Sequence, residues 1–347
     1  MTVSAQKNAD NFPLISIVMP AYNASAFIAV SIQSVLDQTY SHWQLVIVDD
    51  ASTDNTVAII QQFSDPRIQL IQAKKSGRPS RVRNIGLKQC NGALITFLDA
   101  DDCYFPNTLA KLSKPLRQSD RVSVVYGFAK EVSETGEPVA QLFNLIENEK
   151  ATPAIADDDP AFALPATYNH SWFSIATGQI SCVFPGLMLR RETVNAVGDL
   201  NETLATTEDY EYYARLFIYD YNGIYCLSDY VYQYRIHSQS LTKTPQHSAQ
   251  LLNDSIQVLD WLFNDSQMPA YAQAYREKAY TDAYRYLARE RVVHNQNKLA
   301  RKIIFKAAAD AVITRQTFYT TFFPLFVRAL LPARLNQWLI NAKRFFH

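Results

Sequence analysis

The stretch Ala93-Leu94-Ile95-Thr96-Phe97-Leu98-Asp99-Ala100-Asp101-Asp102 decides the fold, because a short apolar run leads directly into three carboxylates. The apolar run predicts an interior strand of a parallel sheet. Carboxylates gathered at the end of such a strand repel one another and lose hydration, so a compensating partner is expected. A divalent cation on a phosphate would supply it, since hard oxygen ligands suit Mg²⁺ or Mn²⁺. The alternative is an acidic turn that caps the next helix.

Two more strands are predicted upstream, and each ends in polar residues. Ile15–Met19 leads into Pro20-Ala21-Tyr22-Asn23, and Gln44–Val48 leads into Asp49-Asp50. A helical pattern follows each of them, which predicts right-handed crossover units and a doubly wound, mostly parallel, Rossmann-like α/β sheet. Because ligands bind beyond the carboxyl ends of such strands, these polar residues are expected to share one site with Asp99 and its neighbours.

Basic residues gather in the segment before the Asp99 strand: Lys74, Lys75, Arg78, Arg81 and Arg83. Gly77 and Pro79 mark a loop that opens a helix, and cations at a helix entrance gain nothing from its dipole. They suit an anion such as a diphosphate. A solvated surface is the alternative for Lys74 and Lys75, whereas Arg83 is predicted to belong to the site. No Gly-x-x-x-x-Gly-Lys-Ser/Thr or Gly-x-Gly-x-x-Gly motif occurs, so P-loop and dinucleotide chemistry are not supported.

Four blocks of sequence, taken together and in this order, resemble glycosyltransferase family 2: Pro20–Asn23, Val46–Asp54, Arg83–Gly86 and Phe97–Asp102. They cover roughly the first hundred residues. The resemblance implies a GT-A fold, a nucleotide-diphosphate-sugar donor and inversion at the anomeric carbon. Two departures, Ala51 where the family often has glycine and Val82 where a small residue is usual, remove no functional group and concern loop geometry.

The resemblance also implies a nucleotide-binding set, consisting of Pro20, Ala21, Tyr22, Asn23, Asp49, Asp50, Arg83, Asp99 and Ala100. Asp50, with Asp49, would accept hydrogen bonds from the base of a nucleotide sugar, with a UDP-sugar expected first. Asp101, supported by Asp99, would hold Mn²⁺ or Mg²⁺ on the diphosphate. His237, in Tyr234-Arg235-Ile236-His237, would complete the metal shell or donate to the diphosphate. The alternative for this histidine is a structural role.

Inversion requires a base that takes the proton of the acceptor hydroxyl. The family places this carboxylate in a Glu-Asp pair at a helix start, and Thr206-Thr207-Glu208-Asp209 matches that pattern. Asp209 is the predicted base and Glu208 the neighbouring candidate, with a threonine as helix cap. Read without the family, acidic residues in a first helical turn are ordinary partners of the helix dipole.

Length and composition suggest the domain organisation. The chain has 347 residues, with 33 basic and 33 acidic side chains, and this neutral balance argues against nucleic acid as a partner. We expect a catalytic domain over 1–245, with a nucleotide-sugar-binding half (1–105) and an acceptor half (106–245), and a helical C-terminal extension over 246–347. Four scattered cysteines, no signal-peptide pattern and no apolar run of ~20 residues indicate a cytoplasmic protein.

The expected function is transfer of one sugar of hexosyl type to a saccharide or lipid-linked acceptor in cell-surface polysaccharide or glycan synthesis. The Gln-x-x-Arg-Trp motif of processive synthases is absent, which favours one sugar per encounter. Two alternatives stay open. A sugar nucleotidyltransferase also uses paired carboxylates on such a sheet, and a catalytically silent nucleotide-sugar-binding module would keep the fold without the reaction.

The end of the chain, residues 313–346, combines aromatic and aliphatic side chains with five basic ones: Arg315, Arg328, Arg334, Lys343 and Arg344. This composition suits an interfacial helix on an anionic membrane, such as the inner face of the plasma membrane. Packing on the catalytic domain or on the second subunit of a homodimer is the alternative.

Overall fold

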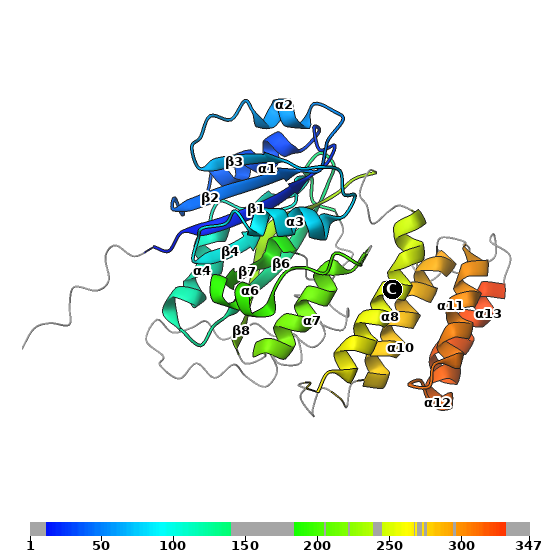
Figure 1. Ribbon diagram of the computed structural model, residues 1–347. Coiled ribbons are helices and arrows are strands. Elements are labelled where there is room, and N and C mark those ends of the chain that lie inside the picture. The colour runs from blue at the N-terminus through cyan, green and yellow to red at the C-terminus, as the bar shows by residue number, and fades with distance from the viewer. Residues whose placement is uncertain are drawn as a thin grey trace, which may run out of the picture.

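The computed structural model describes residues 12–139, 184–204, 206–220, 223–238, 245–266, 268, 273, 276–293 and 296–330. They form an α/β domain and a neighbouring group of helices that follows it in the chain (Figure 1). Of the tail over 313–346, residues 331–346 lie outside this described part.

In the described part, the strands form one eight-stranded sheet in the order β3-β2-β1-β4-β7-β6-β8-β5. Their bounds are β1 Ile15–Ala21, β2 Trp43–Asp49, β3 Ile68–Gln72, β4 Leu94–Phe97, β5 Cys103–Tyr104, β6 Val124–Ser133, β7 Leu187–Arg190 and β8 Ile224–Ile236. The first four strands in that order are parallel, and β6 and β8 are parallel as well, whereas β7 and β5 run antiparallel to their neighbours. This confirms the predicted doubly wound, mostly parallel sheet.

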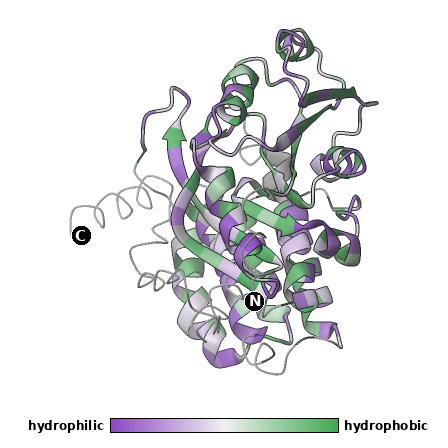
Figure 2. Ribbon diagram, turned by 90° about the vertical axis from the view of Figure 1, so that its left-hand side faces the viewer, coloured by the Kyte–Doolittle hydropathy of each residue, from purple (hydrophilic) through white to green (hydrophobic). Residues whose placement is uncertain are grey.

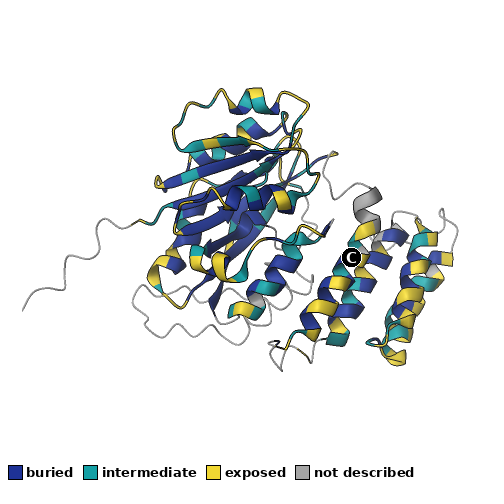
Figure 3. Cartoon of the chain, in the orientation of Figure 1, coloured by how far each residue is buried: buried dark blue, intermediate teal, exposed yellow. Residues whose placement is uncertain are grey.

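Helices cover both faces of the sheet because the strand residues alternate between the faces. Ile17 and Ile47 pack with Ile32 on one face, and Val18 packs with Val82 on the other. The central strands are accordingly hydrophobic and buried (Figures 2 and 3). The helices of this domain are α1 Ile28–Leu36, α2 Thr56–Ile60, α3 Pro79–Leu87, α4 Thr108–Gln118, α6 Arg191–Val197 and α7 Glu208–Asp220.

The parallel strands bring their carboxyl ends to one edge of the sheet. Ala21 at the end of β1 lies opposite Asp49 at the end of β2, and Val18 lies opposite Phe97, two residues before Asp99. The loops that leave these strands therefore meet at the same edge, and the predicted site residues are placed there by strand register.

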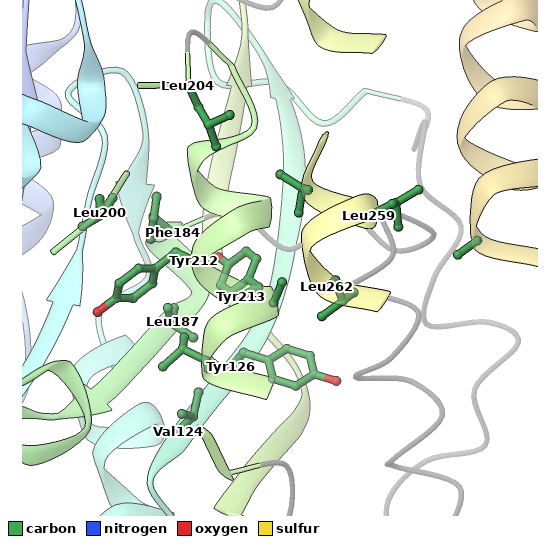
Figure 4. Close-up of a cluster of buried hydrophobic side chains, with 14 of the residues drawn as sticks. Val124, Tyr126, Phe184, Leu187, Leu200, Leu204, Tyr212, Tyr213, Leu259 and Leu262 are labelled. Carbon is green, nitrogen blue, oxygen red and sulfur yellow. The ribbon is translucent and has the colours of Figure 1, made fainter. Parts of the chain in front are cut away.

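The C-terminal part of the described chain is helical, as predicted. Its elements are α8 Pro245–Asn264, α10 Arg276–Val293, α11 Asn297–Ala309, α12 Arg315–Thr317, the single turn η4 Phe318–Phe322 and α13 Phe323–Leu330. Leu259 and Leu262 of α8 belong to the same buried cluster as Leu204, Tyr212 and Tyr213, which lie just before and within α7 (Figure 4). The extension is thus packed on the α/β domain. Across the described residues, no helix has the length and apolar character needed to cross a membrane.

Candidate active site

The loops after β1 and β2 interlock at the carboxyl edge of the sheet. Asn23 Oδ1 accepts the Thr53 N–H at 2.8 Å, and Ser52 Oγ accepts the Asn23 N–H at 2.9 Å. Asn23 and Ala51 have positive φ angles of +47° and +58°. An alanine in this conformation costs about 1–2 kcal/mol, whereas glycine adopts it freely. Ala51, which stands where the family often has glycine, therefore adopts this conformation at a cost in local backbone strain.

Asp49 braces its own loop. Its buried carboxylate accepts the Ser52 N–H at 3.0 Å and the Ser52 hydroxyl. On the neighbouring strand, the Ala21 carbonyl accepts the Asp50 N–H at 2.8 Å, and Pro20 lies opposite Val48 in the register. Pro20, Ala21 and Asp49 therefore shape the edge of the sheet through backbone and loop contacts, and the carboxylate of Asp49 is already occupied by Ser52.

Asp50 is held by the loop after β3. Its carboxylate accepts the N–H groups of Ser76 at 2.6 Å and Gly77 at 2.8 Å, and the Lys75 ammonium lies 3.2 Å from Oδ2. Burial acts to raise the pKa of Asp50, but these hydrogen bonds outweigh it and lower the pKa. Lys75 also lies 2.9 Å from the centroid of the exposed Tyr22 ring. An aromatic face beside a fixed carboxylate is a surface on which a base can stack and form hydrogen bonds.

The three carboxylates after β4 have three different partners. Asp99 Oδ1 accepts from Arg83 at 2.5 Å, Asp101 Oδ2 lies 2.8 Å from His237 Nε2, and Asp102 Oδ1 accepts the Arg235 N–H at 2.9 Å. Asp102 is only 1% exposed. Burial, and then the neighbouring charges of Asp101 and Asp99, raise the pKa of Asp102 well above its usual value. Asp102 is therefore a buried structural acid, although it belongs to the same acidic run as Asp101.

Arg235 fixes the backbone of this acidic loop and was not among the predicted site residues. Its Nε donates to the Asp101 carbonyl at 2.9 Å, and its guanidinium donates to the Glu134 carbonyl at 2.8 Å. The signal in the sequence was its position two residues before His237. The Ala100 carbonyl is also held in position, because it accepts a hydrogen bond from the Ser31 hydroxyl at 2.8 Å.

Asp101 and His237 are the residues best placed to bind a divalent cation. The Asp101 side chain is 36% exposed, whereas His237 is 7% exposed and packs its ring on Phe27 at a centroid distance of 4.7 Å. A carboxylate oxygen and an imidazole nitrogen fit a cation that takes its other ligands from a diphosphate and water. Asp99, the predicted further ligand, bonds to Arg83 instead. Within the described chain, no three His, Cys, Asp or Glu side chains are grouped to hold a metal ion.

Arg83 joins the sheet edge to the start of α7. It is buried, and its two terminal nitrogens donate separately to Asp99 at 2.5 Å and to Glu208 at 3.0 Å. The guanidinium also lies 4.6 Å from the centroid of the Phe184 ring. The sequence predicted that Arg83 faces a diphosphate, but in the structure two protein carboxylates bind its charge. Arg83 therefore lies between the loop after β4 and the start of α7, and its partners in the structure are protein groups.

Asp209 follows Glu208 in the first turn of α7, and its Oδ1 accepts the N–H of Tyr210 at 2.7 Å. Burial, and then repulsion by Glu208, raise the pKa of Asp209 to about 7. A carboxylate with this pKa can exchange a proton near neutral pH, which is the property required of a general base.

Neither threonine caps α7 in the way the sequence predicted. The Thr206 hydroxyl donates to Asp254 Oδ2 at 2.9 Å, and the buried Thr207 hydroxyl has no hydrogen-bond partner among the described residues. Sequence reasoning missed Asp254. It precedes Val258 and Leu262 by four and eight residues, and a carboxylate on the apolar stripe of a helix is the signal that would have found it.

Comparison with known proteins identifies the fold and the family. Residues 16–176 match the glycosyl transferase family 2 domain. A UDP-Glc:alpha-D-GlcNAc-diphosphoundecaprenol beta-1,3-glucosyltransferase of Escherichia coli, WfgD, is 41% identical over 114 residues, which are 33% of this chain and 45% of that protein. The teichuronic acid biosynthesis glycosyltransferase TuaG of Bacillus subtilis, whose assignment is itself provisional, is 40% identical over 101 residues, which are 28% and 40% of the two chains. The matched segment thus spans less than half of each relative.

Two solved structures have a similar fold. Residues 1–349 of S. aureus TarS, in complex with UDP-GlcNAc, align with a TM-score of 0.54 at 18% identity over 90% of both chains. The mannosyltransferase PcManGT from Pyrobaculum calidifontis, in complex with GDP-Man and Mn²⁺, aligns with a TM-score of 0.56 at 18% identity over 94% of this chain and 87% of that one. With its ordered motifs, its sheet and this matching segment, the chain contains a glycosyltransferase family 2 domain and has the GT-A fold.

Proposed function

We propose that the protein is an inverting glycosyltransferase of hexosyl type that moves one sugar from a nucleotide-diphosphate sugar to a hydroxyl of a saccharide or lipid-linked acceptor. One observation carries this proposal. Arg83 binds both Asp99 and Glu208, so the sheet edge and the Glu208-Asp209 helix start belong to one site. A donor site and a base are thereby close enough to act on the same sugar.

The donor side of the site is assigned from Asp50 and its neighbours. Tyr22 offers a ring on which the base can stack, and Asp50 offers a carboxylate that accepts from it, with Lys75 exchanging between Asp50 and the nucleotide. Asp101 and His237 would hold Mn²⁺ or Mg²⁺, which supplies positive charge to the departing diphosphate. A UDP-sugar is the first candidate donor, because WfgD is named as a UDP-Glc-dependent enzyme and the TarS structure is a complex with UDP-GlcNAc.

The acceptor side is assigned to the first turn of α7. Asp209 takes the proton of the acceptor hydroxyl while that oxygen forms a bond to the anomeric carbon. The bond from this carbon to the diphosphate oxygen breaks on the opposite face, which inverts the configuration. The pKa of about 7 at Asp209 suits this role, because near neutral pH an appreciable fraction of the carboxyl groups is ionised and the carboxylate is more basic than an ordinary aspartate.

The acceptor and the location of the protein are proposed together. WfgD is named for a diphosphoundecaprenol-linked acceptor, and TuaG for teichuronic acid synthesis. An acceptor on such a lipid would lie at the inner face of the plasma membrane. We place the protein in the cytoplasm, with peripheral contact to that surface through the tail, and its catalytic unit over 1–245 with the helical extension over 246–347.

A panel of nucleotide sugars tests this function. The purified chain is incubated with Mn²⁺ and UDP-glucose, UDP-GlcNAc or GDP-mannose, and release of free UDP or GDP is measured beside pyrophosphate exchange. We expect nucleotide release with one sugar and its loss in EDTA. Pyrophosphate exchange would instead identify a nucleotidyltransferase. Binding in a thermal-shift assay without turnover of any sugar would identify a silent binding module.

A further inference from the structure

The C-terminal extension reaches the active site through Asp254 of α8. Asp254 Oδ2 accepts two hydrogen bonds from Thr206, from its backbone N–H at 2.8 Å and from its hydroxyl at 2.9 Å. Both residues are buried, with 2% exposure for Thr206 and 3% for Asp254. Thr206 lies two residues before Glu208 in the chain, so the segment that leads into α7 is hydrogen-bonded to α8.

The turn that Asp254 holds has an unfavourable backbone conformation. Thr207 has a φ angle of +61°, which is a true outlier for a β-branched residue. Its carbonyl accepts the Glu211 N–H at 2.9 Å, so this strained residue directs the first turn of α7. Such a conformation persists only where the surroundings impose it. The contacts on both sides of Thr207 are therefore needed to keep Glu208 and Asp209 in place.

The turn is fastened on two sides. Ahead of it, the Arg78 guanidinium donates to the Leu204 carbonyl at 2.8 Å. Asp254 itself is held in position, because its Oδ1 accepts from Gln250 Nε2 at 2.9 Å one turn earlier in α8. Leu259 and Leu262 of α8 also share a buried cluster with Tyr212 and Tyr213 of α7 (Figure 4), so the two helices are packed together.

We propose that Asp254 is a positioning residue, through which the helical extension sets the direction of the Glu208-Asp209 carboxylates. This inference builds on the proposed function. A general base must lie within hydrogen-bond reach of the proton that it abstracts, and a displacement of about 1 Å can cost two orders of magnitude in rate. The helical extension would then contribute to the active site by positioning these carboxylates.

Two substitutions of Asp254 distinguish the effect of its hydrogen bonds to Thr206 from the effect of its negative charge. Asp254→Asn keeps an oxygen for both bonds from Thr206, whereas Asp254→Ala removes them. With the nucleotide sugar that the panel identifies, we expect Asp254→Ala to lower kcat by ~10-fold or more at an unchanged donor KM, and Asp254→Asn to stay near the wild type. Asp260→Asn is the matched control, because this carboxylate on the same helix bonds to Tyr280 within the extension.

Hydrogen exchange supplies a readout that is independent of turnover. Amides of 206–211 should exchange faster in Asp254→Ala than in Asp254→Asn or Asp260→Asn, while UDP affinity in Mn²⁺ is unchanged in all three. Thr206→Val removes only the hydrogen bond of the hydroxyl, so its amide exchange rate over 206–211 should lie between those of Asp254→Asn and Asp254→Ala. If Asp254→Ala does not fold, Thr206→Val takes its place in the comparison.

Two results would overturn the proposal, and a third would contradict the proposed function on which it rests. Equal losses of kcat in Asp254→Asn and Asp254→Ala would assign the effect to charge. A lower melting temperature with normal kcat and normal exchange would make Asp254 merely structural. A wild type that consumes no nucleotide sugar would contradict the proposed function, and exchange would then report only whether Asp254 holds the turn.

Discussion

At the scale of single residues, the site concentrates backbone strain. The described residues other than glycine with positive φ are Asn23, Ala51 and Thr207, and all three lie in loops that carry site residues. Such conformations cost of order 1–3 kcal/mol each and cluster where geometry matters more than stability. Ala51 and Thr207 thus indicate that the loops at the sheet edge are held in one conformation by their hydrogen bonds.

The raised pKa of Asp209 leads to a prediction about pH. A general base acts in its ionised form, so the rate of sugar transfer should rise with pH through about 7 and level off above it. Asp209→Asn should lose ~10²-fold or more in turnover while UDP binding is retained. The measurement is kcat of the wild type and of Asp209→Asn between about pH 5.5 and 9, and the affinity of both for UDP is measured in parallel.

The neighbouring acid provides the control for this prediction. Repulsion by Glu208 contributes to the raised pKa of Asp209, so Glu208→Gln should move the midpoint of the pH profile to lower pH. A nearly inactive Glu208→Gln together with a nearly normal Asp209→Asn would show that the helix is right and the assigned base is wrong.

At the scale of elements, Arg83 connects α3, the loop after β4 and α7. Breaking a buried ion pair costs about 3–5 kcal/mol, because uncompensated charges remain. Asp99 keeps some solvent contact, with 28% of its side chain exposed, so the lower end of this range is expected. Arg83→Met should lower the free energy of unfolding, measured by denaturant titration, by about 3 kcal/mol.

Arg285 is the matched control for Arg83. Its pair with Asp282 leaves 57% of the Arg285 side chain exposed, so Arg285→Met should cost less than about 1 kcal/mol. Similar losses of unfolding free energy in the two variants would mean that the ion pairs of Arg83 with Asp99 and Glu208 stabilise the fold no more than a surface pair does.

The loop after β4 gives a second prediction at this scale, about metal dependence. Asp101→Asn should abolish the gain in UDP affinity that Mn²⁺ brings, because it removes a charged oxygen ligand beside His237. Asp102→Asn should retain it, since an amide keeps the oxygen that accepts the Arg235 N–H. Isothermal titration with UDP, in Mn²⁺ and in EDTA, measures both. A wild type with equal affinity in the two conditions would contradict the assignment.

At the scale of the whole molecule, the far end of the extension has an exposed apolar face. Tyr319, Phe323, Val327 and Leu330 are 44% to 64% exposed, at helical spacing, and Phe305 of α11 is 61% exposed (Figure 3). Residues 296–330 contain one acidic residue, Asp310, and six basic ones: Lys298, Arg301, Lys302, Lys306, Arg315 and Arg328. In a chain of zero net charge, this excess of basic residues supports the proposed contact with an anionic lipid surface.

Membrane binding is tested by substitution of the exposed side chains. Truncation after Thr314 would also remove Phe322 and Ala329, which are buried, so it would confuse unfolding with release. We expect Tyr319→Ser with Phe323→Ser to weaken sedimentation with phosphatidylglycerol vesicles about tenfold, and high salt to weaken binding of the intact chain.

The control replaces two exposed apolar residues elsewhere, with Val30→Ser and Tyr219→Ser. A chain that never sediments with these vesicles, or a Tyr319/Phe323 variant that splits a dimer, would assign the face to protein contact.

The sequence by itself determined the sheet edge at which the site lies. The runs Ile15–Met19, Gln44–Val48 and Ala93–Leu98 predicted parallel strands, and parallel strands must bring their carboxyl ends together. That requirement follows from local pattern and chain handedness, so the edge of the sheet that carries the candidate site could be located without the structure. The spacing of Glu208 and Asp209 also placed both acids in the first turn of a helix.

Only the tertiary structure decided which charged groups become partners. Asp99, Asp101 and Asp102 look alike in sequence, yet one binds Arg83, one faces His237 and one is buried against Arg235. These partners come from segments far apart in the chain, and their choice depends on how strands, loops and α7 pack. The bond between Asp254 and Thr206 spans 48 residues and forms only when α8 packs beside α7, where hydrogen bonds replace the hydration that the buried carboxylate has lost.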